Sequence, residues 1–268
     1  MLIDVHAHFY TERSSRADWR EVNARRLAAG DRMGVTAHVA SILGTWGARS
    51  PTYFPSPEDV TYANDRMLAL QRQHPGKVFG YCVVNPNYTD HAMGEINARL
   101  RDGMIGVKLA ASRRANDGLL DPIAQRAAER GVPILQHIWQ HRRRDWPAQE
   151  ASDAVELCVL AGRHPRARFL LAHLGGGGDW MHSLRALADV ENVWIDLSGS
   201  GVDVGMLEAA LERVGAKRLL WGGDITLDTG WAKLRYLESL GVSPADLERI
   251  KCGNARELFP RGVFDGGR

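Results

Sequence analysis

The sequence is poor in cysteine, with only three among 268 residues. Cys82, Cys158 and Cys252 are odd in number and far apart, and no C-x-x-C pair occurs. Two of them lie in apolar segments, where a thiol is usually a small buried hydrophobic group. The pattern argues against a disulfide framework and against a thiolate metal site, so we expect all three cysteines to be structural.

The sequence also lacks an excess of one charge and any long apolar run. Thirty-four Lys and Arg residues stand against 32 Asp and Glu residues, and the net charge of +2 does not favour nucleic acid or an anionic membrane as a partner. No stretch approaches the length of a membrane span, and the first residues lack the basic, apolar and small-residue order of a signal peptide. We therefore expect a cytoplasmic protein with no nucleic-acid or membrane partner.

What the sequence does contain is a regular series of short apolar runs. Eight runs are typical of buried parallel strands, at residues 2–5, 35–43, 77–85, 104–110, 132–137, 168–173, 192–198 and 218–224. Helical spacing lies between them, for example at residues 59–73 and at residues 151–162, where Gly162 is expected to end the helix. Eight strands that each precede a helix predict an α/β fold, a single-domain (β/α)8 TIM barrel over residues 1–268.

An open doubly wound sheet is the alternative α/β architecture. It would usually have fewer strands and a glycine-rich phosphate loop after the first strand. No G-x-G-x-x-G sequence follows residues 2–5, so a dinucleotide-binding fold is not favoured.

Histidines gather at the ends of the predicted strands. The strands carry or end in His6 and His8 (first), Lys108 (fourth), His137 (fifth), His173 (sixth) and Asp224 (eighth). Histidine makes up only 10 of 268 residues, so its occurrence at the same end of three strands is not expected of ordinary hydrogen-bonded histidines. Because a TIM barrel collects its chemistry at the carboxyl ends of the strands, the pattern predicts a metal site there.

The residue types suit one divalent ion, with Zn²⁺ as the first choice and Mn²⁺ or another ion as alternatives. His6 and His8, two residues apart in an extended chain, point in the same direction. Three neutral imidazoles and one carboxylate can bind such an ion and leave a position for water, whose pKa the ion lowers towards about 7. Hydroxide would then be available at neutral pH.

Several stretches of the sequence resemble a known family. The ordered histidines and aspartate, with the sequences IDVHAHF, GVKL, LAHLGGG and GNARELF, resemble the amidohydrolase superfamily, in particular its amidohydrolase-2 branch. That branch includes metal-dependent hydrolases and nonoxidative decarboxylases. The resemblance spans residues 3–259.

The resemblance implies roles for the site residues. His6, His8 and His137 would be metal ligands, Asp224 a further ligand or a base for the metal-bound water, and His173 an acid or base outside the coordination sphere. The sequence WGGDITLD departs from the S-D-x-P form frequent in the branch, so Asp224 is assigned by its position at the strand end.

Two residues near this set need separate interpretation. Asp228 is expected to be a helix cap. In some binuclear amidohydrolases the lysine equivalent to Lys108 is carboxylated and bridges two metals, which would make His173 a ligand. Otherwise the Lys108 ammonium binds substrate, the role assigned to it here, or forms an internal ion pair.

The predicted loops suggest a small anionic substrate. The candidate substrate-binding residues in them are Arg113, Arg142, Arg143, Arg144 and Trp139, with Arg114, His141 and Trp146 nearby. Guanidinium groups bind carboxylates through two hydrogen bonds and tryptophan offers a flat apolar wall, although a solvated basic loop remains the alternative. The segment 44–57, with Trp46, Tyr53 and Phe54, is typical of a lid or a subunit contact, so a homo-oligomer stays open.

The sequence thus favours a metal-dependent hydrolase of a small, carboxylate-bearing molecule. The metal would polarise the substrate and supply hydroxide, and Asp224 or His173 would take the proton and return it to the leaving group. The alternative is a metal-dependent nonoxidative decarboxylase of an aromatic or unsaturated acid. A noncatalytic metal-binding barrel is disfavoured, because acid, base and ligand types all occur together.

Overall fold

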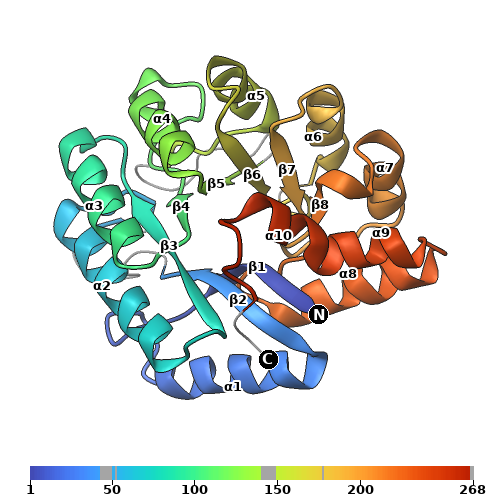
Figure 1. The fold of residues 1–268 in the computed structure, drawn as a ribbon, viewed down its shortest axis with the longest axis horizontal. Coiled ribbons are helices and arrows are strands. Elements are labelled where there is room, and N and C mark those ends of the chain that lie inside the picture. The colour runs from blue at the N-terminus through green and yellow to red at the C-terminus, as the bar shows by residue number, and fades with distance from the viewer. Residues whose placement is uncertain (43–49, 52, 140–148, 177, 266–268) are drawn as a thin grey trace.

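A computed structural model describes residues 1–42, 50–51, 53–139, 149–176 and 178–265. Eight parallel strands form one sheet in the order in which they occur in the chain, with helices around it (Figure 1). The strands are β1 (Leu2–His8), β2 (Val35–Ser41), β3 (Val78–Val84), β4 (Gly106–Leu109), β5 (Pro133–His137), β6 (Arg168–Ala172), β7 (Val193–Asp196) and β8 (Leu219–Leu220). Seven of the eight predicted apolar runs contain one of these strands, and the first run, residues 2–5, forms the first part of β1.

The sheet closes on itself between β8 and β1. The Val5 N–H donates to the Trp221 carbonyl at 3.2 Å, and the Asp224 N–H donates to the His6 carbonyl at 2.6 Å. Ala7 and Asp224 form a parallel bridge at the same edge. The predicted (β/α)8 TIM barrel is confirmed.

Helices follow the strands and form the outer wall of the barrel. They are α1 (Trp19–Met33), α2 (Pro57–Gln73), α3 (Thr89–Arg101), α4 (Asp121–Arg130), α5 (Ala154–Arg163), α6 (Trp180–Leu187), α7 (Met206–Arg213), α8 (Leu227–Ser239), α9 (Pro244–Glu248) and α10 (Asn254–Leu258). Short 3₁₀ turns precede α4 and β8, and a π-helical turn, Arg249–Gly253, joins α9 to α10.

Two predicted helix ends are wrong. Gly162 does not end a helix, because α5 continues to Arg163 and the capping position is His164. Asp228 is not a cap: Thr226 is the N-terminal capping residue of α8, and Asp228 lies in the first helical turn, where a carboxylate interacts favourably with the helix dipole.

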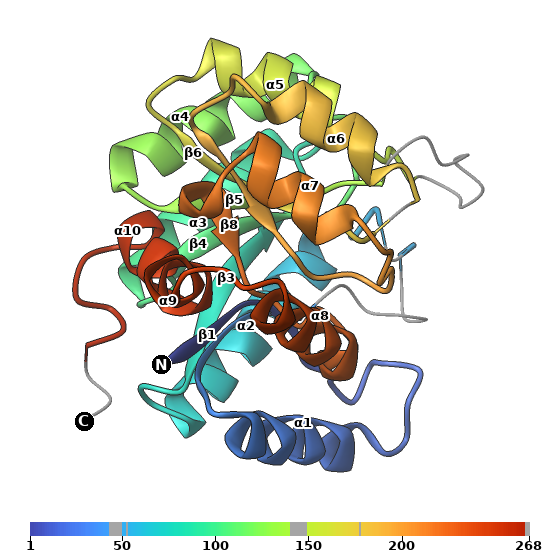
Figure 2. The same cartoon turned by 90° about the vertical axis from the view of Figure 1, so that its right-hand side faces the viewer.

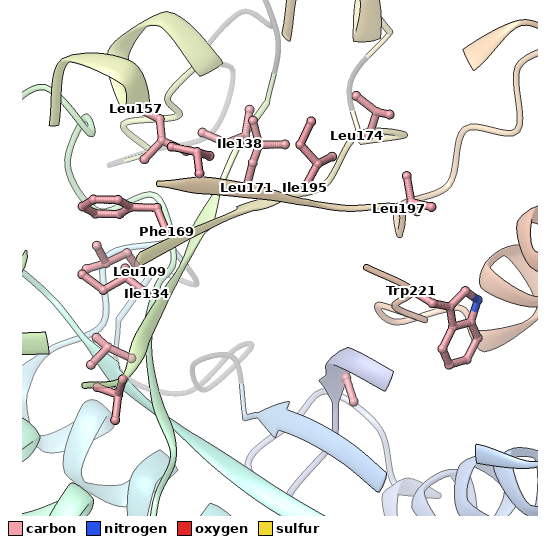
Figure 3. Packing of buried hydrophobic residues seen from close by; sticks show 14 of the residues in the cluster. Leu109, Ile134, Ile138, Leu157, Phe169, Leu171, Leu174, Ile195, Leu197 and Trp221 are labelled. Atoms are coloured by element: carbon pink, nitrogen blue, oxygen red, sulfur yellow. The ribbon is translucent and has the colours of Figure 1, made fainter. Parts of the chain in front are cut away.

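The apolar core has an outer and an inner layer. The outer layer fills the space between strands and helices, and Figure 3 shows part of it, including Phe169 and Leu157. The inner layer fills the barrel, where the Tyr81 hydroxyl donates to the Val5 carbonyl at 2.8 Å. Helix α10 lies at the end of the barrel where the N-terminus lies (Figure 2), and the ring of Phe264 lies 5.3 Å from that of Phe79, near the start of β3. Chain segments after β8 thus cover the amino-terminal end of the barrel. The carboxyl ends of the strands are thereby left for the site.

A register irregularity in β1 determines which of its side chains face the barrel interior. Val5 packs in the inner layer, whereas Ala7, two residues later, packs in the outer layer. The pairing of β1 with β2 shifts between Asp4 and Ala7, as at a β-bulge. This shift aims His6 and His8 inward at the carboxyl end of β1.

The structure also describes the helices that could be tested as membrane spans and the three cysteines. Within the described ranges, no helix is long and apolar enough to cross a membrane. Cys82, Cys158 and Cys252 are unpaired thiols, and burial raises the pKa of each. Thiols with raised pKa values are poor nucleophiles, as expected of structural cysteines.

Candidate active site

His6 and His8 bring two ring nitrogens together at the mouth of the barrel. Their Nε2 atoms lie 2.9 Å apart. His6 Nδ1 lies 2.6 Å from Oδ2 of Asp196, and His8 Nδ1 lies 3.1 Å from the carbonyl oxygen of Ser41. Because a carboxylate and a carbonyl accept hydrogen bonds, Nδ1 of each ring carries the proton, and each Nε2 presents a lone pair to the other.

Asp224 adds a third electron-rich atom to the same space. Its Oδ1 lies 3.3 Å from His8 Nε2 and 3.6 Å from His6 Nε2. The three ligand atoms all lie within 4.8 Å of one another. Two lone pairs and a carboxylate repel one another unless a cation lies among them, and a set of imidazole and carboxylate donors suits a divalent metal. The residues therefore fit the metal that the sequence predicts.

Burial favours the protonation states that a metal requires. It lowers the pKa values of His6 and His8, lowers that of His137 well below its usual range, and lowers that of His173 to about 4. Burial would raise the pKa of Asp224, but the surrounding histidines hold it well below its usual value. The rings are thus neutral and the carboxylate ionised, which are the forms that bind metals.

His137 and His173 lie beside this group. The ring of His173 stacks on that of His6 with centroids 5.6 Å apart, and the His137 ring lies 5.2 Å from that of His173. Among the described residues, His137 Nε2 is buried without a hydrogen-bond partner, so this atom is available to a ligand. His173 Nε2 lies 3.4 Å from Oδ2 of Asp224.

Lys108 is buried inside the site, with 1% of its surface exposed. Its Nζ lies 3.3 Å from Nε2 of His6. Burial lowers the pKa of Lys108 to about 8, although the charges of Asp224 and Asp196 oppose that change. The structure thus places Lys108 among the predicted ligands rather than at the outer rim of the mouth.

Asp196, at the end of β7, is a site residue that the sequence pattern did not predict. Its carboxylate contacts His6 and accepts hydrogen bonds from the backbone N–H and the hydroxyl of Ser198, both at 2.7 Å. Burial raises the pKa of Asp196 to about 7, and the bonds from Ser198 oppose the rise. A carboxylate that fixes the orientation of a ligating histidine is common in metal sites. The available signal was an aspartate at a strand end.

Tyr53 is a second missed residue. Its half-buried ring lies 5.9 Å from the ring of His137 and 6.2 Å from that of Trp139. The sequence predicts that Tyr53 belongs to a lid or a subunit contact, and the structure brings its ring beside that of His137. Tyr53, Trp139 and His137 form an aromatic wall at the site, and the role of Trp139 in binding substrate stays a prediction.

The predicted arginines are less closely tied to the site. Arg113 pairs with Asp117 at 3.6 Å and is 36% exposed. Arg114 pairs with Glu156 at 2.8 Å and with Glu150 at 3.4 Å. Both guanidinium groups therefore have carboxylate partners within the protein. Arg142, Arg143 and Arg144 lie outside the described residues, as do Trp46, His141 and Trp146.

Comparison with known proteins identifies the family. The amidohydrolase family model matches residues 3–261, so the chain belongs to the amidohydrolase family. This confirms the resemblance seen in the sequence. A search of curated proteins found no match.

Several solved structures have a similar fold. One is a 2,6-dihydroxybenzoate decarboxylase complexed with 2,6-dihydroxybenzoate, with a TM-score of 0.72 and 19% identity, covering 96% of this chain and 98% of that one. Another is a dihydroxybenzoic acid decarboxylase from Polaromonas sp. JS666 with bound manganese and the inhibitor 2-nitroresorcinol. Its TM-score is 0.71 at 16% identity, and the match covers 100% of this chain and 97% of that one. A third is 4-oxalomesaconate hydratase from Rhodopseudomonas palustris, with a TM-score of 0.68 and 15% identity, covering 97% of this chain and 96% of that one. At these identities the likeness shows the fold.

Proposed function

We propose that the protein is a metal-dependent nonoxidative decarboxylase of a small aromatic acid, the function that the sequence ranked second. The observation that carries the proposal is the aromatic wall of Tyr53, Trp139 and His137 beside the converging atoms of His6, His8 and Asp224. A planar ring fits against such a wall while its carboxylate reaches the cation site. Two of the similar structures above are decarboxylases of hydroxylated benzoates, which supports this choice.

The proposed metal ligands are His6, His8, Asp224 and His137. A divalent ion held there, zinc or manganese, would supply Lewis-acid charge for an anionic substrate. Asp196 keeps the His6 ring in the orientation that presents Nε2 to the site. Lys108, when protonated, adds positive charge next to the substrate carboxylate.

The reaction needs a proton at the carbon that loses the carboxylate. When that C–C bond breaks, carbon dioxide leaves, the ring carbon keeps the electron pair, and it takes up a proton. His173 Nε2 and Asp224 Oδ2, 3.4 Å apart, form a pair that can take up this proton from water before the substrate binds and then deliver it to the carbon. Tyr53 and Trp139 would exclude water from the face of the ring.

Hydrolysis of a small carboxylate-bearing molecule is the second candidate. The observation in its favour is the same contact between Asp224 and His173, which could take a proton from water and pass it to a leaving group. The two functions share a site and differ in the bond that breaks.

The test is release of carbon dioxide from 2,6-dihydroxybenzoate by protein loaded with Zn²⁺ or Mn²⁺. We expect release that stops on chelation and returns with the metal. An ester and an amide of the same acid should remain intact. Metal-dependent cleavage of either one without carbon dioxide release would favour hydrolysis instead.

Variants separate the proposed ligands from the proposed proton carrier. His6→Ala, His8→Ala and His137→Ala should lose both bound metal and turnover. His173→Ala should retain the metal and lose turnover by about 10²- to 10⁴-fold, because an acid or base contributes to rate rather than to coordination. Elemental analysis after dialysis checks this, and loss of metal from the His173 variant would show it to be a ligand.

A further inference from the structure

Helix α1 reaches the candidate metal centre through one buried side chain, Arg26. Only 8% of the surface of Arg26 is exposed. Its Nη1 donates to the carbonyl oxygens of Asp224 at 2.6 Å and Ile225 at 3.2 Å, and its Nη2 donates to Oδ2 of Asp4 at 2.9 Å. One guanidinium group thus joins an outer helix to β1 and to the loop after β8.

Asp4 orients this guanidinium and is itself held from several sides. Its Oδ2 also contacts Nδ1 of the buried His38 at 2.9 Å. Its Oδ1 accepts the backbone N–H groups of His6 at 3.2 Å and Gly223 at 2.8 Å. Asp4 therefore links the backbone next to one candidate ligand, His6, with the backbone next to the other, Asp224.

The backbone of Asp224 needs support of this kind. Its φ angle is 53°, in the left-handed region that residues other than glycine rarely adopt. In this conformation its N–H donates to the His6 carbonyl, its own carbonyl accepts from Arg26, and its side chain reaches His6 and His8. The contact with Arg26 thus fixes the peptide group that follows Asp224.

We infer that Arg26 is a positioning residue for the metal centre. By holding the carbonyl groups of Asp224 and Ile225 and pairing with Asp4, it fixes the left-handed turn that aims the Asp224 carboxylate at His6 and His8. The inference rests on the metal site of the proposed function and goes beyond it, since Arg26 contacts neither the cation site nor a substrate. Loss of these hydrogen bonds should lower the affinity for metal more than it lowers the stability of the protein.

A second arginine provides a matched control. Arg218 precedes β8 at the opposite end of the barrel and donates to the carbonyl oxygens of Leu187 and Ala188, each at 2.9 Å. Arg26→Lys and Arg218→Lys both keep the charge and remove the planar fork that can bind two carbonyls at once. Only the first change lies next to a candidate ligand.

The experiment measures Co²⁺ binding to the purified parent and to both variants. Competition with a chelator gives the affinity, and the visible absorption spectrum of bound Co²⁺ reports the geometry of its ligands. Arg26→Lys should lower the affinity by about tenfold to a hundredfold and change the spectrum, as substitutions behind metal ligands do. Arg218→Lys should match the parent in both. Neither measurement uses a substrate, so an error in the proposed substrate class leaves the test intact.

Each remaining outcome has a definite meaning. If folded Arg26→Lys binds Co²⁺ as the parent does, with the same spectrum, the inference is wrong. If the parent binds no Co²⁺, the metal centre itself fails and the inference with it. Should circular dichroism show that Arg26→Lys does not fold, His38→Gln replaces it, because this change loosens Asp4 and leaves Arg26 present. We then expect a loss of affinity of about threefold or more, and a parent-like affinity would overturn the inference.

Discussion

Helices α1 and α5 lie on opposite sides of the barrel (Figure 1). They differ in the residues that they bury against it. The buried residues of α1 are Asn23, Arg26 and Gly30. Those of α5 are Ala154, Leu157, Leu160 and Ala161. The fully buried residues of α1 are thus polar or small, while its apolar Leu27 and Met33 are only partly buried against the core. The fully buried residues of α5 are all apolar.

The difference indicates that the two helices serve different purposes. Apolar burial is favourable and non-directional, so it holds α5 in place without fixing any particular backbone group. Hydrogen bonds have directions, and those of α1 end on Tyr10, which follows β1, and on Asp224, which follows β8. Both positions flank the candidate metal centre. Changes in α1 should therefore disturb the site, and changes in α5 should disturb stability.

The largest expected effect on stability is that of Leu160→Ala in α5. Leu160 is fully buried in the outer layer of the core, so its truncation should lower the free energy of unfolding by about 2–5 kcal/mol through lost burial and the remaining cavity. Urea denaturation measures the loss, and metal affinity should stay unchanged. The control is Val159→Ala on the same helix, where 47% exposure predicts a change within about 0.5 kcal/mol. A metal site weakened by Leu160→Ala would contradict the division between the two helices.

Asn23→Ala in α1 should have a smaller effect on stability and a larger one on the site. Asn23 accepts from the Tyr10 N–H and donates to the Tyr10 carbonyl, both at 2.9 Å. Removal of the amide takes away both hydrogen bonds and should cost about 2 kcal/mol in unfolding free energy. Because Tyr10 lies two residues after His8, metal affinity should fall as well. Parent-like affinity in a destabilised Asn23 variant would limit the role of Asn23 to stability.

The same contrast explains which parts of the fold could be predicted from the sequence. All eight strands are predicted, since strands buried on both faces form apolar runs that need no partner to be recognised. The helix in residues 59–73 is recognisable by its apolar spacing in the same way. The helix over residues 19–33 offers a weaker pattern, because its fully buried residues are polar or glycine and its apolar Leu27 and Met33 are only partly buried.

The ends of β1 and β8 show what sequence patterns miss. β1 extends to His8, beyond the predicted residues 2–5, because polar residues continue its pairing with β2. β8 is shorter than predicted because Gly222, Gly223 and the left-handed Asp224 follow it. Hydrophobicity sets the predicted bounds, whereas backbone conformation sets the real ones.

The candidate site divides in a similar way. The strand-end rule for barrels was enough to select His6, His8 and Asp224, which the structure brings together. Asp196 meets the same rule, as an aspartate at the end of β7, but was not selected. Arg26 could not be selected so, because it lies in a helix and acts on Asp224, 198 positions away. No local pattern records such pairs. The choice of reaction was also beyond the sequence, which ranked hydrolysis above the decarboxylation now proposed.

Two glycines inside the compared helices should give the smallest effects, and these should be opposite in sign. A Cβ at Gly30 would lie 2.7 Å from Nε2 of His38, whereas a Cβ at Gly162 would meet no atom within 4 Å. Gly30→Ala should therefore push His38 away from Asp4 and destabilise the protein by about 1 kcal/mol. Gly162→Ala should stabilise it by about 0.5–1 kcal/mol, since alanine restricts the unfolded chain and favours the helix.

Urea denaturation measures the stability of both glycine variants, and Co²⁺ affinity is measured on the same samples. Each variant adds one methyl group, so the two helices are compared by the effect of the same small change. Gly30→Ala should weaken Co²⁺ binding, because His38 touches Asp4, which orients Arg26 behind Asp224. Gly162→Ala should leave binding at the parent value while raising stability. If both variants stabilise the protein and bind Co²⁺ equally well, the buried polar face of α1 tolerates a displaced His38. The contrast between α1 and α5 would then be one of composition alone and not of function.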